Sequence, residues 1–547
     1  MFSSEFKFYL LLPLPLVLAF FRPAWGRTFF DRTEAAFCRL ANRPWRCVAL
    51  VGLVAFVASA APSLVRLPAP KIHDEFCYLL AADTFAHGRL TNPTHPLWQH
   101  FESMYLIQQP TYNAKYPPGQ GALVALGQIL GHPILGVWLG LAAAGATVCW
   151  MLQAWLPARW ALLGGLLMAL HPLTLTWGYN YWGGAVATIG GALVGRGIRT
   201  IADTRRDGGW CLGAGLFFLA HSRPYEGLIV SVFAIASTMF LIARMGWAEC
   251  RKTLRHCGLP LLIGSILTVS SIGIYNYRVT GSPLQMPYFV HVKQYEVVPF
   301  FIGQSFRPEP EYRHRELREF HTQTQVDLLG SRNGVASRLL QKFYAQAQGW
   351  LWMGLWLPPL LPLPWLLKGN RWLQVAVFCL GGLLAGLLWA VGIFPHYAAP
   401  GAALLVFVVV QGLRRLRLCR RERGTGLAFA RWLCVLCLAT VPAVWSRLLA
   451  KNAEGWFRDR ERVAAQLEAA PGRHLVFVRY TADHNPNREW VYNAADIDHA
   501  KVVWSREMTP PEDQQVLHYF RDRKIWVLEA DLPQPQPRPY SPDTAGR

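Results

Sequence analysis

Charge is scarce in this sequence of 547 residues: 16% of the residues are Asp, Glu, Lys or Arg, whereas 52% are hydrophobic. Soluble domains usually carry about 25% charged residues, so this composition argues against a soluble fold. The apolar residues also gather in runs with almost no charge, such as 47–64, 373–393 and 398–413. A bilayer core about 30 Å thick needs about 20 apolar residues in a helix, so these runs predict a polytopic membrane protein.

Several motifs with known chemistry are missing as well. The sequence contains no His-Glu-x-x-His, no phosphate-binding Gly-rich loop and no Gly-x-Ser-x-Gly. It has eleven cysteines, but no Cys-x-x-Cys or His/Cys cluster with the character of a metal site, and no disulfide framework. No internal repeat is visible, so a transporter built from two similar halves gains no support.

Positive charge is plentiful, with a formal net charge of +21. The basic residues sit in short loops between apolar runs, which is the pattern of cytoplasmic loops, so we do not expect a nucleic-acid partner. The clusters lie at Arg27–Arg46, Arg199–Arg206, Arg244–Arg255, Lys368/Arg371 and Arg414–Arg423.

If these basic clusters lie on the cytoplasmic side, the sequence predicts about twelve membrane spans. The run 119–131 is too short to cross, and the chain must cross an odd number of times between Pro118 and Arg199, so this run is expected to be an interfacial helix. The expected spans are 6–21, 47–65, 134–156, 160–177, 183–195, 209–221, 227–243, 258–277, 349–367, 372–393, 398–413 and 427–447.

The predicted organisation has four parts. Residues 1–46 form an anchor helix and a basic loop, and residues 47–448 form an all-α membrane domain with outer loops 71–118 and 278–348. Residues 449–531 form a small extracytoplasmic α/β domain, because the stretches 474–480, 500–504 and 524–528 are typical of short strands around a helix at 511–523. The tail 532–547 is Pro-rich, which is typical of an extended or disordered segment.

The chemistry-bearing residues collect on the predicted outer side. Asp74 and Glu75 begin the first outer loop, where two acids can act on a head group at the interface or simply favour a helix N-terminus. Arg223 lies in a turn between two apolar runs, where it can bind phosphate or pair with Glu226. Lys115 is a second candidate cation, or a residue whose amine only reaches toward water.

Two aromatic segments also lie at the predicted outer ends of spans. His396 and Tyr397 could contact sugar or phosphate, or belong to the aromatic belt of the interface. The turn Trp177–Trp182 favours such a belt.

The first outer loop resembles that of the GT-C glycosyltransferase superfamily, which includes protein O-mannosyltransferases and the aminoarabinose transferase of lipid A. The similar segments are Asp74-Glu75-Phe76-Cys77-Tyr78 followed by Ala81-Ala82, and Lys115-Tyr116-Pro117-Pro118-Gly119. The order of span, acidic pair, helix and Pro-Pro also resembles these enzymes, over residues 45–450. The His- and Trp-rich stretch 92–100 is not part of the resemblance.

The resemblance implies an inverting transfer of a sugar from a polyprenyl-phosphate donor to a lipid, glycan or protein acceptor outside the cytoplasm. Asp74 would be the general base and Glu75 its partner, with Tyr78 and Tyr116 at the substrate. The inner membrane would be the location, and membrane lipid a partner. Asp74 and Glu75 could hold a divalent cation, but the sequence does not require one.

Two alternatives use the same topology without this chemistry. A transporter or flippase of a lipid-linked glycan would need charges deep within the spans, and most spans here are uncharged. A non-catalytic scaffold that presents the C-terminal domain leaves the positions of Asp74, Glu75 and Arg223 without a purpose.

Overall fold

The computed structural model describes residues 13–329, 334–352, 354–392, 394–418 and 424–541. Most of these residues are helical, and seven helices are long and apolar enough to cross a membrane. They are α4 with its short continuation η1 (Pro44–Ala60, Ala61–Leu64), α7 (Pro133–Trp155), α12 (Pro224–Ala243), α13 (Trp247–Thr280), α20 (Arg371–Trp389), η4 with α21 (Pro395–Gly401, Ala402–Leu416) and α22 (Thr425–Lys451).

Shorter helices fill the space between these seven. The predicted span 160–177 is divided at His171–Pro172, because proline cannot donate the backbone hydrogen bond that a continuous helix needs. The remaining elements of the bundle are α2 (Pro13–Phe21), α3 (Arg27–Ala41), α8 (Ala158–Ala169), α9 (Pro172–Trp177), α10 (Ala185–Ala202) and α11 (Asp207–Ala220).

Three expectations need correction. The segment 349–367 is not one helix: α17 (Val335–Trp350) ends at its start, and a proline-rich stretch leaves only α18 (Leu357–Leu360) and α19 (Leu363–Leu367). The basic residues 251–255 lie within α13 rather than in a loop. Residues 6–12 of the first expected span and 420–423 of the last basic cluster lie outside the described residues, so the count of twelve spans stays a prediction.

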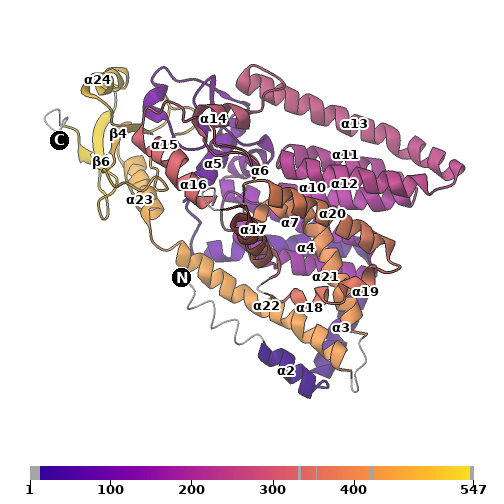
Figure 1. Ribbon diagram of the computed structural model, residues 1–547. Coiled ribbons are helices and arrows are strands. Elements are labelled where there is room, and N and C mark those ends of the chain that lie inside the picture. The colour runs from indigo at the N-terminus through magenta and orange to yellow at the C-terminus, as the bar shows by residue number, and fades with distance from the viewer. Residues whose placement is uncertain (1–12, 330–333, 353, 393, 419–423, 542–547) are drawn as a thin grey trace.

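The segments expected outside the membrane gather at one end of the bundle (Figure 1). The first loop contains α5 (His73–Ala86), a small sheet of β1, β2 and β3 (Asn92–Pro93, Leu106–Ile107, Thr111–Ala114) around the 3-10 turn η2 (Trp98–Phe101), and α6 (Pro118–Ile129). The helix α6 matches the short helix expected at 119–131. The second loop contains α14 (Pro287–Tyr295), α15 (Arg315–Glu319), the π-helical turn η3 (Phe320–Thr324) and α16 (Gln325–Leu328).

The C-terminal region has the strand–helix alternation that the sequence predicts. Its elements are α23 (Trp456–Ala469), β4 (His474–Arg479), β5 (Val502–Arg506), α24 (Pro510–Tyr519), β6 (Lys524–Glu529) and β7 (Arg538–Pro539). The sheet has the order β5-β4-β6-β7, in which β4 pairs parallel with both β5 and β6. The proline-rich tail contributes β7, an antiparallel edge strand, while residues 542–547 lie outside the described residues.

One hydrophobic cluster joins this C-terminal region to the first loop. Phe76 of α5 stacks on Tyr492 with ring centroids 4.1 Å apart, and the neighbouring His73 ring lies 2.7 Å from the same tyrosine's hydroxyl. The stretch 92–100 also packs here: His95 Nε2 lies 3.1 Å from Asp498, and His100 Nδ1 lies 3.2 Å from the Arg506 carbonyl. The stretch that lies outside the family resemblance therefore anchors the C-terminal region.

Candidate active site

The two acids at the start of α5 have different surroundings. Glu75 is fully buried, and its carboxylate accepts hydrogen bonds from the backbone N–H groups of Lys71 (2.8 Å), Ile72 (3.2 Å) and Tyr181 (3.1 Å). Burial raises the pKa of Glu75 to about 7, and the bonds from these amides oppose the rise. Glu75 therefore fixes the linker before α5 and caps the N-terminus of the helix, a position where acidic residues are favoured.

Asp74 is half-buried and largely uncommitted. One of its carboxylate oxygens accepts a hydrogen bond from the phenol of Tyr116, and no other donor from the described residues is found on it. The free lone pairs of such a carboxylate can accept a proton from a bound hydroxyl group. Tyr78, one helical turn along α5, stacks on Tyr116 with ring centroids 5.0 Å apart.

The sequence Tyr116-Pro117-Pro118-Gly119 brings this tyrosine to Asp74. A residue before proline is held extended, and Pro118 is the first residue of α6, a position that proline favours. The Gly119 N–H donates to the His221 carbonyl at 2.8 Å, and a Cβ atom at Gly119 would lie 2.7 Å from that oxygen. Glycine thus lets the end of the first loop lie directly against the turn that carries Arg223.

Arg223 occupies the N-cap position of α12. Its guanidinium carbon lies 4.7 Å from the ring centroid of Tyr397, and Arg223 is half-buried. Burial lowers the pKa of Arg223, but Tyr78, Glu226, Tyr397 and Tyr116 together raise it by more, which places all four near the guanidinium.

The pair between Arg223 and Glu226, the alternative to phosphate binding, is not formed. Within the described ranges the guanidinium makes no ion pair and no side-chain hydrogen bond, and Glu226 is 8% exposed without an ion pair. The five N–H donors of Arg223 are thus available for a ligand.

Tyr78 connects Arg223 to Asp74. Burial raises the pKa of Tyr78, Arg223 opposes the rise and Asp74 adds to it. The Tyr78 phenol is therefore close enough to feel both charges, and the same two charges act on Tyr397.

His396 and Tyr397 lie in η4 at the edge of this cluster. The His396 ring contacts Trp182, with centroids 4.5 Å apart, and Tyr397 edge-on at 4.6 Å. The Nδ1 atom of His396 is buried, and no partner for it is found among the residues that the structure describes. Tyr397 packs against the Arg223 guanidinium, and His396 packs against Tyr397 and Trp182.

Lys115 has a different environment from Arg223. It is 2% exposed, its amine donates to Glu296 at 2.8 Å, and the ring centroid of Tyr105 lies 3.4 Å from the Nζ atom. Burial raises the pKa of Glu296, and Lys115 and His291 lower it by more, so the net shift is downward. Lys115 is consequently neutralised within the protein and does not offer a free charge.

Most of the residues expected at the site therefore lie together. The cluster contains Asp74, Tyr78, Tyr116, Arg223, Glu226, His396 and Tyr397. Glu75 points to backbone amides instead, and Lys115 lies behind Tyr116, paired with Glu296.

Two neighbours of the site were not expected from the sequence. Tyr288 of α14 lies 5.2 Å from Lys115 and 6.5 Å from the Tyr116 ring, measured at its ring centroid. Glu296, at the end of the same helix, holds Lys115. A lone acid between apolar residues in VKQYEVVPF was the only local signal for Glu296.

The aromatic turn after α9 also has a role that its composition did not indicate. Trp177, Tyr179 and Tyr181 are buried, and the hydroxyls of Tyr179 and Tyr181 donate to the carbonyls of Arg66 and Pro68. Together with Glu75, this turn fixes the linker that leads from α4 to Asp74. The expected membrane belt is wrong for these three residues.

No group of three or more His, Cys, Asp or Glu residues able to hold a metal ion occurs in the part of the chain that the structure describes. A divalent cation shared by Asp74 and Glu75 would also have to displace the three amides on Glu75.

No protein-family profile matches the sequence, and a search of curated proteins finds none that matches. Solved structures do show similarity. ArnT from Cupriavidus metallidurans in the apo state is 11% identical with a TM-score of 0.48, covering 91% of this chain and 93% of that one. The Archaeoglobus fulgidus oligosaccharyltransferase in the apo form is 10% identical with a TM-score of 0.43, covering 88% and 69%.

The archaeal oligosaccharyltransferase AglB from the same organism, in complex with an inhibitory peptide and a dolichol-phosphate, gives 10% identity and a TM-score of 0.40 with the same coverage. These proteins are GT-C membrane glycosyltransferases, the class that the first loop resembles. At these scores the likeness carries no argument about the activity of this chain.

Proposed function

We propose that this protein is a membrane glycosyltransferase that moves a sugar from a polyprenyl-phosphate donor to a hydroxyl acceptor outside the cytoplasm. One observation carries the proposal. An uncommitted carboxylate, Asp74, and an uncommitted guanidinium, Arg223, lie in the same aromatic cluster at the end of the helical bundle where both loops gather.

The reaction is a single displacement at the anomeric carbon. Asp74 takes the proton of the acceptor hydroxyl as its oxygen forms a bond to that carbon. The bond between the anomeric carbon and the phosphate oxygen breaks, and polyprenyl phosphate leaves with the bonding electrons. Attack from the face opposite the leaving group inverts the configuration, which matches a base and a phosphate-binding cation on separate elements, α5 and the N-cap of α12.

Arg223 stabilises the leaving group. Negative charge grows on the phosphate oxygens as the bond breaks, and a guanidinium can donate two parallel hydrogen bonds to them. The Tyr397 face beneath the guanidinium keeps the cation in place without using its N–H donors. Tyr78, Tyr116 and His396 offer the hydroxyl and ring nitrogen groups that can orient a sugar.

A donor with a polyprenyl chain suits the position of the site. Arg223 stands at the start of α12, and Tyr397 lies in η4 at the start of the candidate span Pro395–Leu416, so the cluster lies at the ends of two membrane-capable helices. A lipid phosphate at the membrane surface would therefore reach Arg223 without leaving the bilayer.

A transporter would need charges free to line a path through the bundle. Arg196 is paired with Asp207, and the buried Lys342 donates to the Leu387 carbonyl, so neither of these buried cations is free.

Transfer can be tested with purified protein in nanodiscs, a radiolabelled polyprenyl-phosphate sugar and an extract of envelope lipids and glycans. We expect loss of label from the donor and its recovery on an acceptor in the wild type, but not in Asp74→Asn. Movement of intact donor between leaflets without bond cleavage would support the flippase instead.

The side of the membrane can be tested separately. Asn485 is exposed in the C-terminal region, and a Cys introduced there should react with a membrane-impermeant maleimide in intact cells that have a permeable outer layer. Labelling that requires cell lysis would place the C-terminal region and the site in the cytoplasm.

A further inference from the structure

A polar cavity lies in the C-terminal region, at the carboxyl ends of β4, β5 and β6. Its volume is about 530 Å³, within the range of about 300–1,000 Å³ usual for small-molecule sites. It is lined by His314, Glu316, Val478, Arg479, Tyr480, Thr481, Arg506, Glu507, Glu529, Asp531 and Leu532.

The topology of the sheet favours ligand binding at this edge. The chain runs from β4 to β5 on one side and then crosses to β6 on the other side of β4. In open parallel sheets the crevice for ligands forms outside the carboxyl ends of the strands, where the strand order reverses. Arg479 ends β4 and Glu529 ends β6, so both stand beside this reversal.

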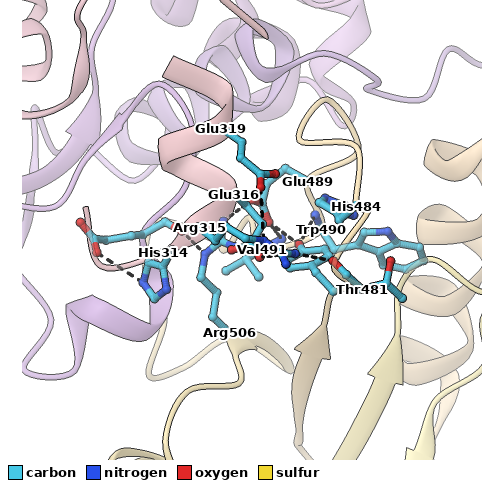
Figure 2. Close-up of polar contacts among 12 residues, drawn as sticks. His314, Arg315, Glu316, Glu319, Thr481, His484, Glu489, Trp490, Val491 and Arg506 are labelled. Carbon is cyan, nitrogen blue, oxygen red and sulfur yellow. Dashed lines mark hydrogen bonds and ion pairs between the residues drawn. The ribbon is translucent and has the colours of Figure 1, made fainter. Parts of the chain in front are cut away.

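The opposite wall comes from the second outer loop (Figure 2). Glu316 of α15 lies 3.3 Å from Nη1 of Arg506, and another guanidinium nitrogen of Arg506 contacts Glu489. Arg506 is 2% exposed, and its Nε atom donates to the Glu102 carbonyl at 2.9 Å. The wall is therefore held by a buried network, and the cavity has a defined shape before any ligand binds.

The charges on the wall restrict the ligand. The lining carries four carboxylates (Glu316, Glu507, Glu529 and Asp531) and two guanidinium groups. Both guanidinium groups are already paired: Arg479 with Glu507 and Arg506 with Glu489 and Glu316. The excess of carboxylates would repel an anion, and the two arginines would repel a lysine- or arginine-rich peptide.

Hydroxyl groups avoid both conflicts, because each one can donate to a carboxylate and accept from a guanidinium or a backbone N–H. Glu529, with 44% of its side chain exposed, provides an acceptor, and beside it lies Asp531, whose carboxylate already contacts Thr481 and His484. We propose that this cavity binds a saccharide without acidic groups. This binding is separate from the transfer proposed at Asp74 and requires neither Asp74 nor Arg223.

The test is calorimetry on the full-length protein in nanodiscs with three neutral disaccharides: cellobiose, chitobiose and mannobiose. At least one should bind. Replacing Glu529→Gln should weaken that binding about tenfold or more, because a hydrogen bond to a charged acceptor is lost. The fold should survive, since Arg479 keeps its pairing with Glu507 and lies 3.8 Å from Glu529.

The sheet offers a matched control at its other edge. Asp522 lies 3.7 Å from Arg473, between the amino ends of β4 and β6, much as Glu529 lies beside Arg479. Asp522→Asn should leave saccharide binding unchanged. Leu532→Trp fills the mouth from a position that is 46% exposed, and it should abolish binding without altering the melting temperature.

Several results would overturn the proposal. These are no binding of any of the three disaccharides, equal affinities for wild type and Glu529→Gln, tighter binding of cellobiouronic acid than of cellobiose, or tighter binding of a trilysine peptide. Asp74→Asn separates this site from the transfer site. It should bind the disaccharide like the wild type, so a failed transfer assay and a failed binding assay are distinct results.

Discussion

The two polar sites differ in whether their charged side chains are already paired within the protein. At the bundle end, Asp74 and Arg223 keep free lone pairs and free N–H donors, whereas at the edge of the C-terminal sheet both arginines of the cavity already contact carboxylates. Unpaired charges suit a reaction in which charge develops, because their interactions with the reacting groups become stronger as the transition state forms. Charges that are paired in advance suit binding of a neutral ligand with many hydroxyl groups.

The same contrast appears at shorter range within the first loop. Glu75 follows Asp74 directly, yet its carboxylate holds backbone amides and its exposure is 0%. Lys115 precedes Tyr116 directly, yet its amine is held by Glu296. Asp74 and Tyr116 thus each have a charged neighbour in the sequence that is committed to structure, and substitutions can separate the two kinds of role.

The largest effect is expected from Asp74→Asn. An amide has the same size but cannot accept the acceptor's proton, so turnover should fall about 10²–10⁴-fold. The melting temperature should stay close to that of the wild type, because the described residues donate a single hydrogen bond to Asp74, from Tyr116. Sugar transfer and thermal unfolding of the same purified protein are the measurements.

Glu75→Gln is the control for this substitution. It should lower the melting temperature, since the buried amide cannot satisfy all three backbone N–H groups, and should reduce turnover less than Asp74→Asn. Near-normal turnover in purified Asp74→Asn would reject Asp74 as the base.

Lys115→Met should act on stability rather than on the reaction. It leaves the buried Glu296 carboxylate without its cation, which costs about 3–5 kcal/mol when one partner of a buried pair is removed. The double variant Lys115→Met/Glu296→Leu should recover most of this free energy. Denaturant unfolding measures the change, and turnover per folded molecule should stay within about threefold of wild type.

If Lys115 bound the donor phosphate instead, the double variant would be stable and inactive. That result would move the phosphate site from the Arg223 turn to the end of the first loop.

Arg223→Ala is expected to lower turnover about 10²–10³-fold, the usual cost of removing one donor that stabilises developing charge. Arg223→Lys should fall between this variant and wild type, because an ammonium cannot donate two parallel hydrogen bonds to phosphate. Donor affinity and melting temperature should be measured on both proteins. The double variant Arg223→Met/Glu226→Leu provides the critical comparison: full activity in this protein would show that Arg223 has no part in phosphate binding.

Much of this arrangement can be read from the sequence where the physical signal is local. Apolar length predicts the long helices α4, α7, α12, α13, α20, α21 and α22, and short stretches typical of strands predict β4, β5 and β6 within two residues. The resemblance of the first loop points to Asp74 and Tyr116, and a charge between two apolar runs points to Arg223; their roles stay predictions. Proline accounts for the main error, because four prolines between residues 358 and 364 break a run whose hydropathy alone predicts a span.

Pairing across the chain could not be read in the same way. Glu296 lies 181 positions from Lys115, and Tyr492 lies 419 positions from His73, so no local pattern shows that either pair meets. The roles of Lys115 and Glu75 therefore depended on the tertiary structure. The cavity on the C-terminal sheet was not predicted either, since its walls come from loops that are distant in the sequence.

The smallest effect concerns pH, and it compares His73 with Glu75. Burial, with Lys115 and Arg506, lowers the pKa of His73 from 6.5 to about 3, so the folded protein keeps it neutral where the unfolded chain binds a proton. Stability from this group is therefore lost as pH falls below about 6.5. Burial raises the pKa of Glu75 from 4.5 to about 7, so its contribution is present at low pH and is lost as pH rises from about 4.5 to 7.

The two groups oppose each other between pH 5 and 6.5, and the variants should separate them. Relative to wild type, His73→Asn should gain melting temperature as the pH falls across this window, and Glu75→Gln should lose it. Each pH unit corresponds to at most about 1.4 kcal/mol for one group. Tyr492→Phe keeps His73 but removes the hydroxyl 2.7 Å from its ring, so it should be less stable at every pH while following the wild-type pH slope. If melting temperature followed pH in parallel for wild type, His73→Asn and Glu75→Gln, neither His73 nor Glu75 would be buried as the structure of α5 shows.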